Sequence, residues 1–265
     1  MNMKDVKVLI IGDIVGRPGR YCLRDLLPKI QENYEIDFTI ANGENAAAGK
    51  GITKKAMNSL LESGVDLITS GNHIWDKKEI FKFIDEERSI IRPANFPPGN
   101  PGNGHQIIET NSVNIGVINL SGRVFMSSID CPFQKGKEII DKITHDCNII
   151  IIDFHAEATS EKMALARYFD GKVSAIIGTH THIQTADEQV LPAGTGYITD
   201  VGMTGPYESI LGVESQAVID NFITGIPTKF EVAEGKVQFN GVVVHLDSDN
   251  GICKKIERIQ DLHEF

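Results

Sequence analysis

The sequence predicts an α/β protein in which two sheets stack as a sandwich and helices flank them on the outside. Three observations lead to this prediction. Short β-branched runs alternate with helical patterns through the first two-thirds of the chain, and antiparallel strands follow in the tail. The third observation is that no internal repeat or linker divides the 265 residues, so we expect a single domain over 1–265.

The first third of the chain predicts alternating strands and helices. An apolar stripe with i, i+3, i+4, i+7 spacing follows the first strand and indicates a helix, which Pro28 should kink or shorten. Thr53 is a suitable N-cap for a second helix that closes at Gly64. Asp76, with a glutamate three residues later, predicts the start of a third helix. The strands predicted here are 6–11, 38–41 and 66–69.

The pattern becomes irregular after residue 90. Prolines and glycines over 93–104 predict a long connection, which is either the rim of a site or a plain surface loop. The runs 106–109 and 114–120 predict a hairpin, with its turn at 110–113. A further helix should begin near Ser160 and close at Gly171. The remaining predicted strands are 148–153, 174–177, 189–191, 196–199, 228–232 and 236–246.

Charge and cysteine content exclude several classes of protein. The chain has 26 Lys and Arg against 36 Asp and Glu, so its net charge of −10 argues against non-specific binding to nucleic acid or to an anionic membrane. No apolar run approaches the roughly 18 residues of a spanning helix. The cysteines are too scattered for a disulfide framework or a thiolate zinc site; they are Cys22, Cys131, Cys147 and Cys253. We expect a soluble cytoplasmic protein, and self-association stays open.

Five predicted strands each end in a side chain that can hold a metal ion or move a proton. Ligands bind at the carboxyl edge of α/β sheets, so these side chains should gather at one site. They offer oxygen and nitrogen donors without a thiolate, which suits divalent transition metals. In chain order they are Asp13; Glu44 and Asn45; Asn72 and His73; His155; and His180 and His182.

Each of these residues also has a structural interpretation. Asp13 alone is explained better as the cap of the next helix, and His155 alone as a hydrogen-bonded core histidine. Glu44 and Asn45 fit a polar turn. His180 and His182 are harder to explain in this way, because alternate positions of a strand point the same way. The structural interpretation needs five independent coincidences at five strand ends, so we favour the metal site.

Other candidate residues give weaker signals. The segment 12–16 lacks both established glycine-rich phosphate motifs. Arg17 and Arg123 fit either phosphate contact or a solvated surface. Four histidines have no partner at ligand spacing and are expected to be structural or exposed: His105, His145, His245 and His263.

The ordered blocks of the chain resemble the calcineurin-like metallophosphoesterases. The blocks that carry this resemblance are Gly12-Asp13, Gly43-Glu44-Asn45, Gly71-Asn72-His73, His155 and Gly178-Thr179-His180-Thr181-His182. Together with the segments 12–16, 42–45 and 199–205, they are similar to the bacterial YmdB-type branch over nearly the whole chain. The resemblance implies a two-sheet α/β sandwich with a dinuclear metal site, and hydrolysis of phosphodiesters, notably cyclic nucleotides including 2′,3′-cyclic ones.

The resemblance also implies a role for each residue. Glu44 would bridge two divalent ions, most simply iron or manganese, with zinc or cobalt as alternatives. A hydroxide bridging the ions would attack phosphorus, and His73 would protonate the leaving oxygen. The first ion would be held by Asp13 and His182 with Asn45, and the second by Asn72, His155 and His180.

The sequence departs from the wider superfamily in two places. Asp13 is followed by Ile14 and Val15 instead of the usual Asp-x-His, and the bridging position is Glu44 instead of aspartate. We therefore expect a metal-dependent phosphodiesterase of small cyclic nucleotides, of the 2′,3′ type first and the 3′,5′ type second. The alternatives are a phosphomonoesterase or nucleotidase on the same site, an RNA- or protein-binding module with structural metals, and a metal-free structural protein.

Overall fold

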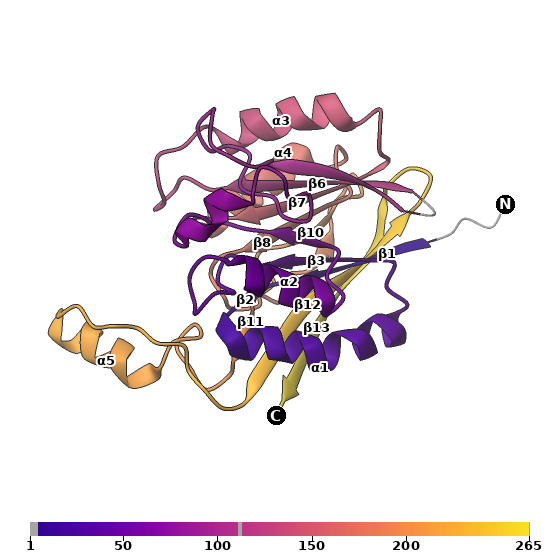
Figure 1. Ribbon diagram of the computed structural model, residues 1–265. Helices are drawn as coiled ribbons and strands as arrows, with labels where there is room; N and C mark the ends of the chain where they lie inside the picture. Colours follow the sequence, from indigo (N-terminus) through magenta and orange to yellow (C-terminus); the bar gives the residue numbers. More distant parts are fainter. Residues whose placement is uncertain (1–4, 111–112, 265) are drawn as a thin grey trace.

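The computed structural model describes residues 5–110 and 113–264, in which two sheets stack face to face between layers of helices (Figure 1). This confirms the predicted α/β sandwich. One sheet has the order β2 (Asp13–Ile14), β11 (Met203–Pro206), β12 (Val237–Asp247), β1 (Asp5–Ile11), β3 (Phe38–Asn42) and β4 (Leu67–Thr69), with β13 (Cys253–His263) also paired to β12. The other has the order β5 (His105–Glu109), β6 (Asn114–Ser121), β7 (Ile149–His155), β8 (Ala175–Thr179), β10 (Gly196–Ile198) and β9 (Gln189–Val190).

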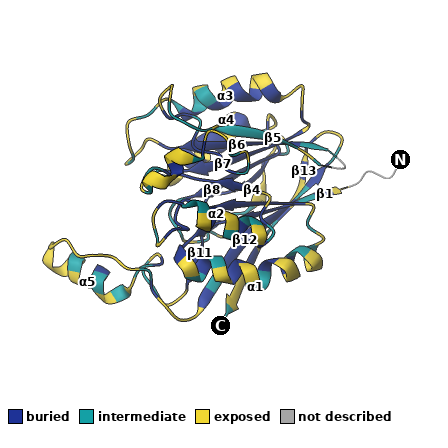
Figure 2. Ribbon diagram, in the orientation of Figure 1, coloured by how far each residue is buried: buried dark blue, intermediate teal, exposed yellow. Residues whose placement is uncertain are grey.

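Apolar side chains on alternate strand positions hold these layers together. On β1, Val8 and Ile10 face the second sheet, while Leu9 and Ile11 join the core under the helices. The first sheet is covered by α1 (Gly16–Tyr34) and α2 (Lys54–Glu62), and the second by α3 (Pro132–Ile143) and α4 (Thr159–Phe169). The short 3₁₀ helix η1 spans Lys78–Lys82, and α5 (Ser215–Thr224) projects from the sandwich with most of its surface exposed (Figure 2).

Parallel pairing brings the predicted site residues to one edge. Strands β1, β3 and β4 run parallel in the first sheet, as do β6, β7, β8 and β10 in the second. The loops that leave β1, β3, β4, β7 and β8 therefore emerge at the carboxyl edges of their sheets, where α/β proteins bind ligands.

Two local predictions are confirmed in the first half of the chain, and of the two effects expected from Pro28, a kink or a shorter helix, the shorter helix is not found. The Thr53 side chain caps α2 by accepting from the Ala56 amide at 3.2 Å. The hairpin forms as β5 and β6, although residues 111–112 of its turn lie outside the described residues. Pro28 does not shorten its helix, because α1 continues to Tyr34. Pro28 and Arg24 are exposed, so water can bind the carbonyl that loses its partner while the buried face still packs.

Two other predictions are also corrected by the structure. Asp76 starts no α-helix, since only the 3₁₀ turn η1 follows and its N-cap is Lys77. Residues 228–232 form no strand but a mostly exposed connection with one isolated bridge, from Val232 to Val213, outside both sheets. The sequence did not predict α3, α5, β2, β11 or β13.

Among residues 5–110 and 113–264, no helix combines the length and apolarity needed to cross a membrane.

Candidate metal centre

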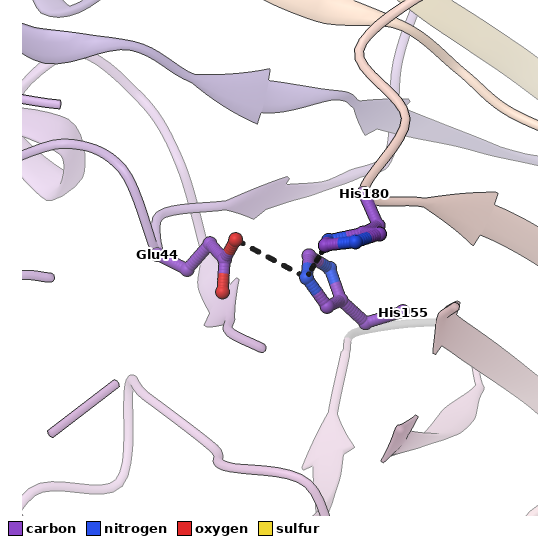
Figure 3. Close-up of side chains that lie close together, drawn as sticks. All are labelled: Glu44, His155 and His180. Atoms are coloured by element: carbon purple, nitrogen blue, oxygen red, sulfur yellow. Dashed lines mark hydrogen bonds and ion pairs between the residues drawn. The ribbon is translucent and has the colours of Figure 1, made fainter. Parts of the chain in front are cut away.

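Three ligand-type atoms converge on one ring nitrogen at the carboxyl edge. Nε2 of the buried His155 lies 3.1 Å from Oε1 of Glu44 and 3.0 Å from Nδ1 of His180 (Figure 3). The side-chain oxygen of Asn72 lies 3.0 Å from the same nitrogen. One ring nitrogen donates at most one proton, so it cannot satisfy three partners by hydrogen bonding. A cation between these four groups would satisfy all of them.

A second group of side chains lies beside the first. Oδ2 of Asp13 accepts from the His180 amide at 3.1 Å, but the buried Oδ1 has no hydrogen-bond partner among the described residues. Nε2 of His182 lies 3.9 Å from that oxygen and 3.1 Å from the side-chain nitrogen of Asn45. Buried carboxylate oxygens are nearly always partnered, so the orphaned oxygen fits a metal ligand. As placed, Asn45 presents its amide nitrogen, and ligation through oxygen needs a half-turn of the amide.

The two groups together form one cluster, made of Asp13, Glu44, Asn45, Asn72, His155, His180 and His182. Each of its three imidazoles has one ring nitrogen that faces away from the other ligands and donates its N–H to an oxygen. Nδ1 of His155 lies 3.0 Å from the Thr179 hydroxyl, and Nε2 of His180 lies 3.2 Å from the Glu157 carboxylate. Nδ1 of His182 lies 3.1 Å from the Leu211 carbonyl. These partners orient the three rings so that their inward nitrogens point to a shared metal position, which is how metal-binding histidines are held.

The support for His155 extends deeper into the sandwich. The Thr179 hydroxyl donates to Oδ1 of Asp153 at 2.7 Å, so it is free to accept from His155. The other oxygen of Asp153 accepts from the Thr69 hydroxyl and, at 3.0 Å, from the side-chain amide of Asn42. Burial raises the pKa of Asp153, and these hydrogen bonds oppose that rise. The sequence placed Thr179 and Asn42 in the blocks of the family resemblance but did not predict this supporting role, and Asp153 and Thr69 looked like ordinary strand residues.

Replacing Thr179 with valine should loosen the site without removing a ligand. Val keeps the shape of the side chain but leaves Nδ1 of His155 without an acceptor. We expect metal affinity or turnover to fall by about 10- to 100-fold, the usual cost of losing such a partner. Thr179→Ser keeps the hydroxyl and should behave like the wild type in metal titrations. Equal metal affinity in the Val, Ser and wild-type proteins would show that the hydroxyl does not position His155.

Charges within the cluster favour a cation at its centre. Burial lowers the pKa of His155, but the carboxylates of Glu44 and Asp13 outweigh it and raise the pKa to about 9. Burial would raise the pKa of Glu44, yet the charge and hydrogen bond of His155 lower it to about 2. Burial and the neighbouring His155 lower the pKa of His180 to about 3, which keeps this ring neutral. In the metal-free protein a proton on His155 supplies the positive charge that a metal ion would bring.

The loop after β8 carries two histidines in an unusual backbone conformation. β8 ends at Thr179, and His180 and His182 have φ angles of 100° and 67°. They are therefore not alternate strand positions, so that reason for expecting them together is wrong. Such backbone costs about 1–3 kcal/mol per residue and persists only where other contacts enforce it. Asp200 supplies these contacts by accepting from the amide and hydroxyl of Thr181 at 3.1 and 2.7 Å.

A buried ion pair holds Asp200 in turn. Nζ of Lys162 on α4 lies 2.7 Å from the same Asp200 oxygen, and both residues are almost fully buried. The second oxygen of Asp200 accepts from the Gly202 amide at 2.8 Å. Lys162 thus fixes the histidine loop from behind the sheet, and its role was not predicted.

The structure explains why position 71 is a glycine. A methyl group at this position would collide with the side chains of His155 and Glu44. The glycine before Asn72 therefore leaves the centre of the cluster open, and any other residue would fill the space that a cation needs.

His73 lies at the border of the cluster and is partly exposed. Its amide donates to Oε2 of Glu44 at 3.0 Å, and Nδ1 of its ring lies 3.0 Å from Oδ2 of Asp76. The Asp76 carboxylate therefore orients the ring. Asp76 was interpreted from sequence as a helix start, whereas its partner is the expected general acid three residues before it.

The structure also distinguishes the residues of the cluster from the other histidines of the chain. Asp13 does not cap α1, whose N-cap is Val15. His245 pairs with Glu257, and His263 with Asp25, away from the cluster. The structure therefore brings all seven predicted ligands and His73 to one edge, and places these two histidines beside carboxylates elsewhere.

Comparisons with known proteins identify the family of the chain. The family model described as YmdB-like protein matches residues 9–259. The chain belongs to the YmdB-like family. This confirms the family resemblance found in the sequence.

Relatives of this YmdB-like protein cover its full length. It is 53% identical over 262 residues to a 2′,3′-cyclic-nucleotide 2′-phosphodiesterase of Bacillus subtilis strain 168, covering 98% of this chain and 99% of the relative. A crystal structure of a hypothetical protein from Thermus thermophilus shares 41% identity with a TM-score of 0.92, covering 97% of this chain and 100% of that one. A phosphatase structure from Mycoplasma pneumoniae shares 37% identity with a TM-score of 0.94, covering 99% and 95%.

Proposed function

We propose that this protein is a metal-dependent phosphodiesterase that hydrolyses small cyclic nucleotides, 2′,3′-cyclic ones first and 3′,5′-cyclic ones second. The observation that carries the proposal is the convergence of Glu44, Asn72 and His180 on one nitrogen of His155. The printed name of the Bacillus subtilis relative, at 53% identity, supports the substrate class.

The ligand set divides into two groups that share Glu44. Asn72, His155 and His180 would hold one divalent ion, and Asp13, His182 and Asn45 the other. Such a pair of ions supplies an activated water and positive charge for the phosphate oxygens. The donors are oxygens and imidazole nitrogens, so we propose iron or manganese, with zinc or cobalt as alternatives.

The chain itself handles the proton at the leaving oxygen. His73 follows the ligand Asn72, so its imidazole lies beside the place where a bound phosphodiester reacts. Protonated His73, held by Asp76 at 3.0 Å, would give its proton to the departing alkoxide. Alkoxides of ordinary alcohols leave poorly, so this transfer matters most for natural diesters.

We also propose that the protein works in the cytoplasm. All four cysteines are free, and three of them are buried: Cys22, Cys147 and Cys253. Burial raises the pKa of Cys22 to about 12 and that of Cys253 to about 11. Unpaired cysteines of this kind are usual in a reducing compartment.

A substrate panel tests the proposed activity. Purified protein, with its metal content measured, is assayed on 2′,3′-cyclic AMP, 3′,5′-cyclic AMP, bis-p-nitrophenyl phosphate and p-nitrophenyl phosphate. We expect turnover of the diesters that disappears after treatment with a chelator and returns with added metal. Faster turnover of the monoester than of any diester would favour a phosphomonoesterase, and no metal-dependent turnover would favour a binding module.

Asn45→Ala should weaken one metal site preferentially. A neutral amide is a weaker donor than the imidazole that the wider superfamily supplies, so the ion beside Asp13 and His182 should be the looser one. We expect loss of about one ion per chain, and activity that falls at low metal and recovers in part at high metal.

A carboxylate at the same position provides the matched control. Asn45→Asp offers an oxygen without any half-turn and should retain both ions. Two tightly held ions and unchanged metal dependence in Asn45→Ala would show that Asn45 is a turn residue only.

A further inference from the structure

A pocket of about 230 Å³ opens directly beside the metal centre. Asn72 lines it and also contacts His155, so the pocket begins at the cluster itself. Ser121 lines it too, and pairs with His155 across the neighbouring strands β6 and β7. Anything attached to a phosphate at the metal centre can therefore extend into this pocket.

The pocket wall is aromatic and apolar. Trp75 and Phe96 form one side, with ring centroids 6.1 Å apart and planes tilted by 42°. Phe81 stacks on the indole at 5.1 Å with planes 10° apart, which fixes its orientation. Met126 and Ile129, from the loop after β6, contribute to the lining.

Polar groups without formal charge complete the lining. Asn100 and Ser127 add an amide and a hydroxyl, and none of the lining residues of this pocket is charged. A flat, uncharged ring with hydrogen-bonding edges matches such a wall, whereas a second phosphate does not. The volume is below the roughly 300–1,000 Å³ of sites that enclose a whole drug-sized ligand, so it suits one ring system.

The segment 93–104 supplies part of this wall through Phe96, Pro97 and Asn100. Arg92 holds the segment in place, because its guanidinium donates to the carbonyls of Pro93, Asn100 and Pro101 at 2.8, 3.0 and 3.0 Å. The proline- and glycine-rich connection therefore forms part of the rim of this pocket. A rim fixed in this way can select among ligands.

We propose that this pocket is a nucleobase subsite, in which Trp75 and Phe96 bind the base of a nucleotide whose phosphate lies at the metal centre. The proposal rests on the proposed function and deepens it, because it makes the enzyme prefer nucleoside cyclic phosphates to cyclic phosphates without a base. A larger pocket of about 380 Å³ is lined by residues that include Arg17, Lys229 and Glu231. None of the candidate metal ligands lines it, so it is not a candidate for the base of a nucleotide bound at the metal centre.

A pair of substrates that differ only in the base tests the proposal. Adenosine 2′,3′-cyclic phosphate is compared with 1-O-methylribose 2′,3′-cyclic phosphate, and the ratio of their kcat/KM values measures the contribution of the base. We expect Trp75→Leu to lower this ratio by about 5- to 150-fold, the scale of base–aromatic stacking. Trp75→Phe keeps an aromatic ring and should restore most of the ratio, and Tyr168→Leu, on α4, should leave both substrates unaffected.

A binding measurement separates failure of the subsite from failure of the activity. Trp75 is the single tryptophan of the chain, so its fluorescence reports directly on the pocket. Adenosine 3′-monophosphate should quench it, and ribose 3-phosphate should not. Equal effects of the two ligands, or a kcat/KM ratio unchanged in Trp75→Leu, would overturn the subsite. Quenching by the adenosine compound in a protein that hydrolyses neither cyclic phosphate would overturn the activity and keep the subsite.

Discussion

Glu44→Gln should abolish both the paired metal site and the turnover. Glutamine has nearly the same volume and can still accept from the His73 amide, but it lacks the negative charge that two cations would share. The pKa of Glu44 is held at about 2, so the wild-type side chain is fully ionised at neutral pH. Metal analysis should find at most one ion per chain, and hydrolysis of 2′,3′-cyclic AMP should fall to the level of the chelator-treated wild type.

Glu157→Gln is the matched control for this variant. It makes the same change in a half-exposed carboxylate that contacts Nε2 of His180 from outside the cluster. We expect it to retain two ions and to lose about 10- to 100-fold in affinity or activity at most. Thermal unfolding of the metal-free variants shows whether either one has lost its fold. A Glu44→Gln protein with two ions and near-normal turnover would contradict the bridging role.

His73→Ala should slow natural diesters by about 10²–10⁴-fold while both ions stay bound, since that is the usual contribution of general acid–base catalysis. A p-nitrophenolate leaving group needs little protonation, so the loss on bis-p-nitrophenyl phosphate should be much smaller. The measurement is the kcat of the variant on both substrates at saturating metal.

A histidine outside the cluster provides the comparison. His245 is also partly buried and pairs with a carboxylate, but it lies on β12 opposite Lys7, at the start of β1. His245→Ala should leave the ratio of the two substrates unchanged. Equal losses on both substrates in His73→Ala would indicate that His73 positions the substrate and does not donate a proton.

The sequence predicted that the candidate residues would gather at one edge, because parallel strands determine where their ends meet. Each short apolar run specified a strand, and each strand end specified the position of Asp13, Glu44, Asn72, His155 or His180 without knowledge of any tertiary contact. Local capping was equally predictable, since Thr53 and the amide it binds lie three residues apart.

Contacts between distant segments could not be predicted in this way. Asp76 lies three residues from a glutamate, which is typical of a helix start, but its partner is a ring that matters only once the cluster exists. Thr179 and Asp153 look like ordinary strand residues, and the link between them forms across two strands. Lys162 looks like a solvated helix residue until Asp200 comes beside it.

The tail of the chain was predicted least well for a related reason. Residues 228–232 have the composition of a strand, yet they lie near the projecting α5, where no described strand pairs with them over their length. The pairing of β12 with both β1 and β13 depends on the assembled sheet. Propensity alone does not specify such pairing.

Titration of metal-free protein with Mn²⁺ tests the central claim most directly. Bound metal and hydrolysis of 2′,3′-cyclic AMP are followed in the same sample as the ion is added. The ligand geometry predicts saturation at two ions per chain, with turnover that appears mainly as the second ion binds. Full turnover without metal, or with a single bound ion per chain, would contradict a dinuclear phosphodiesterase.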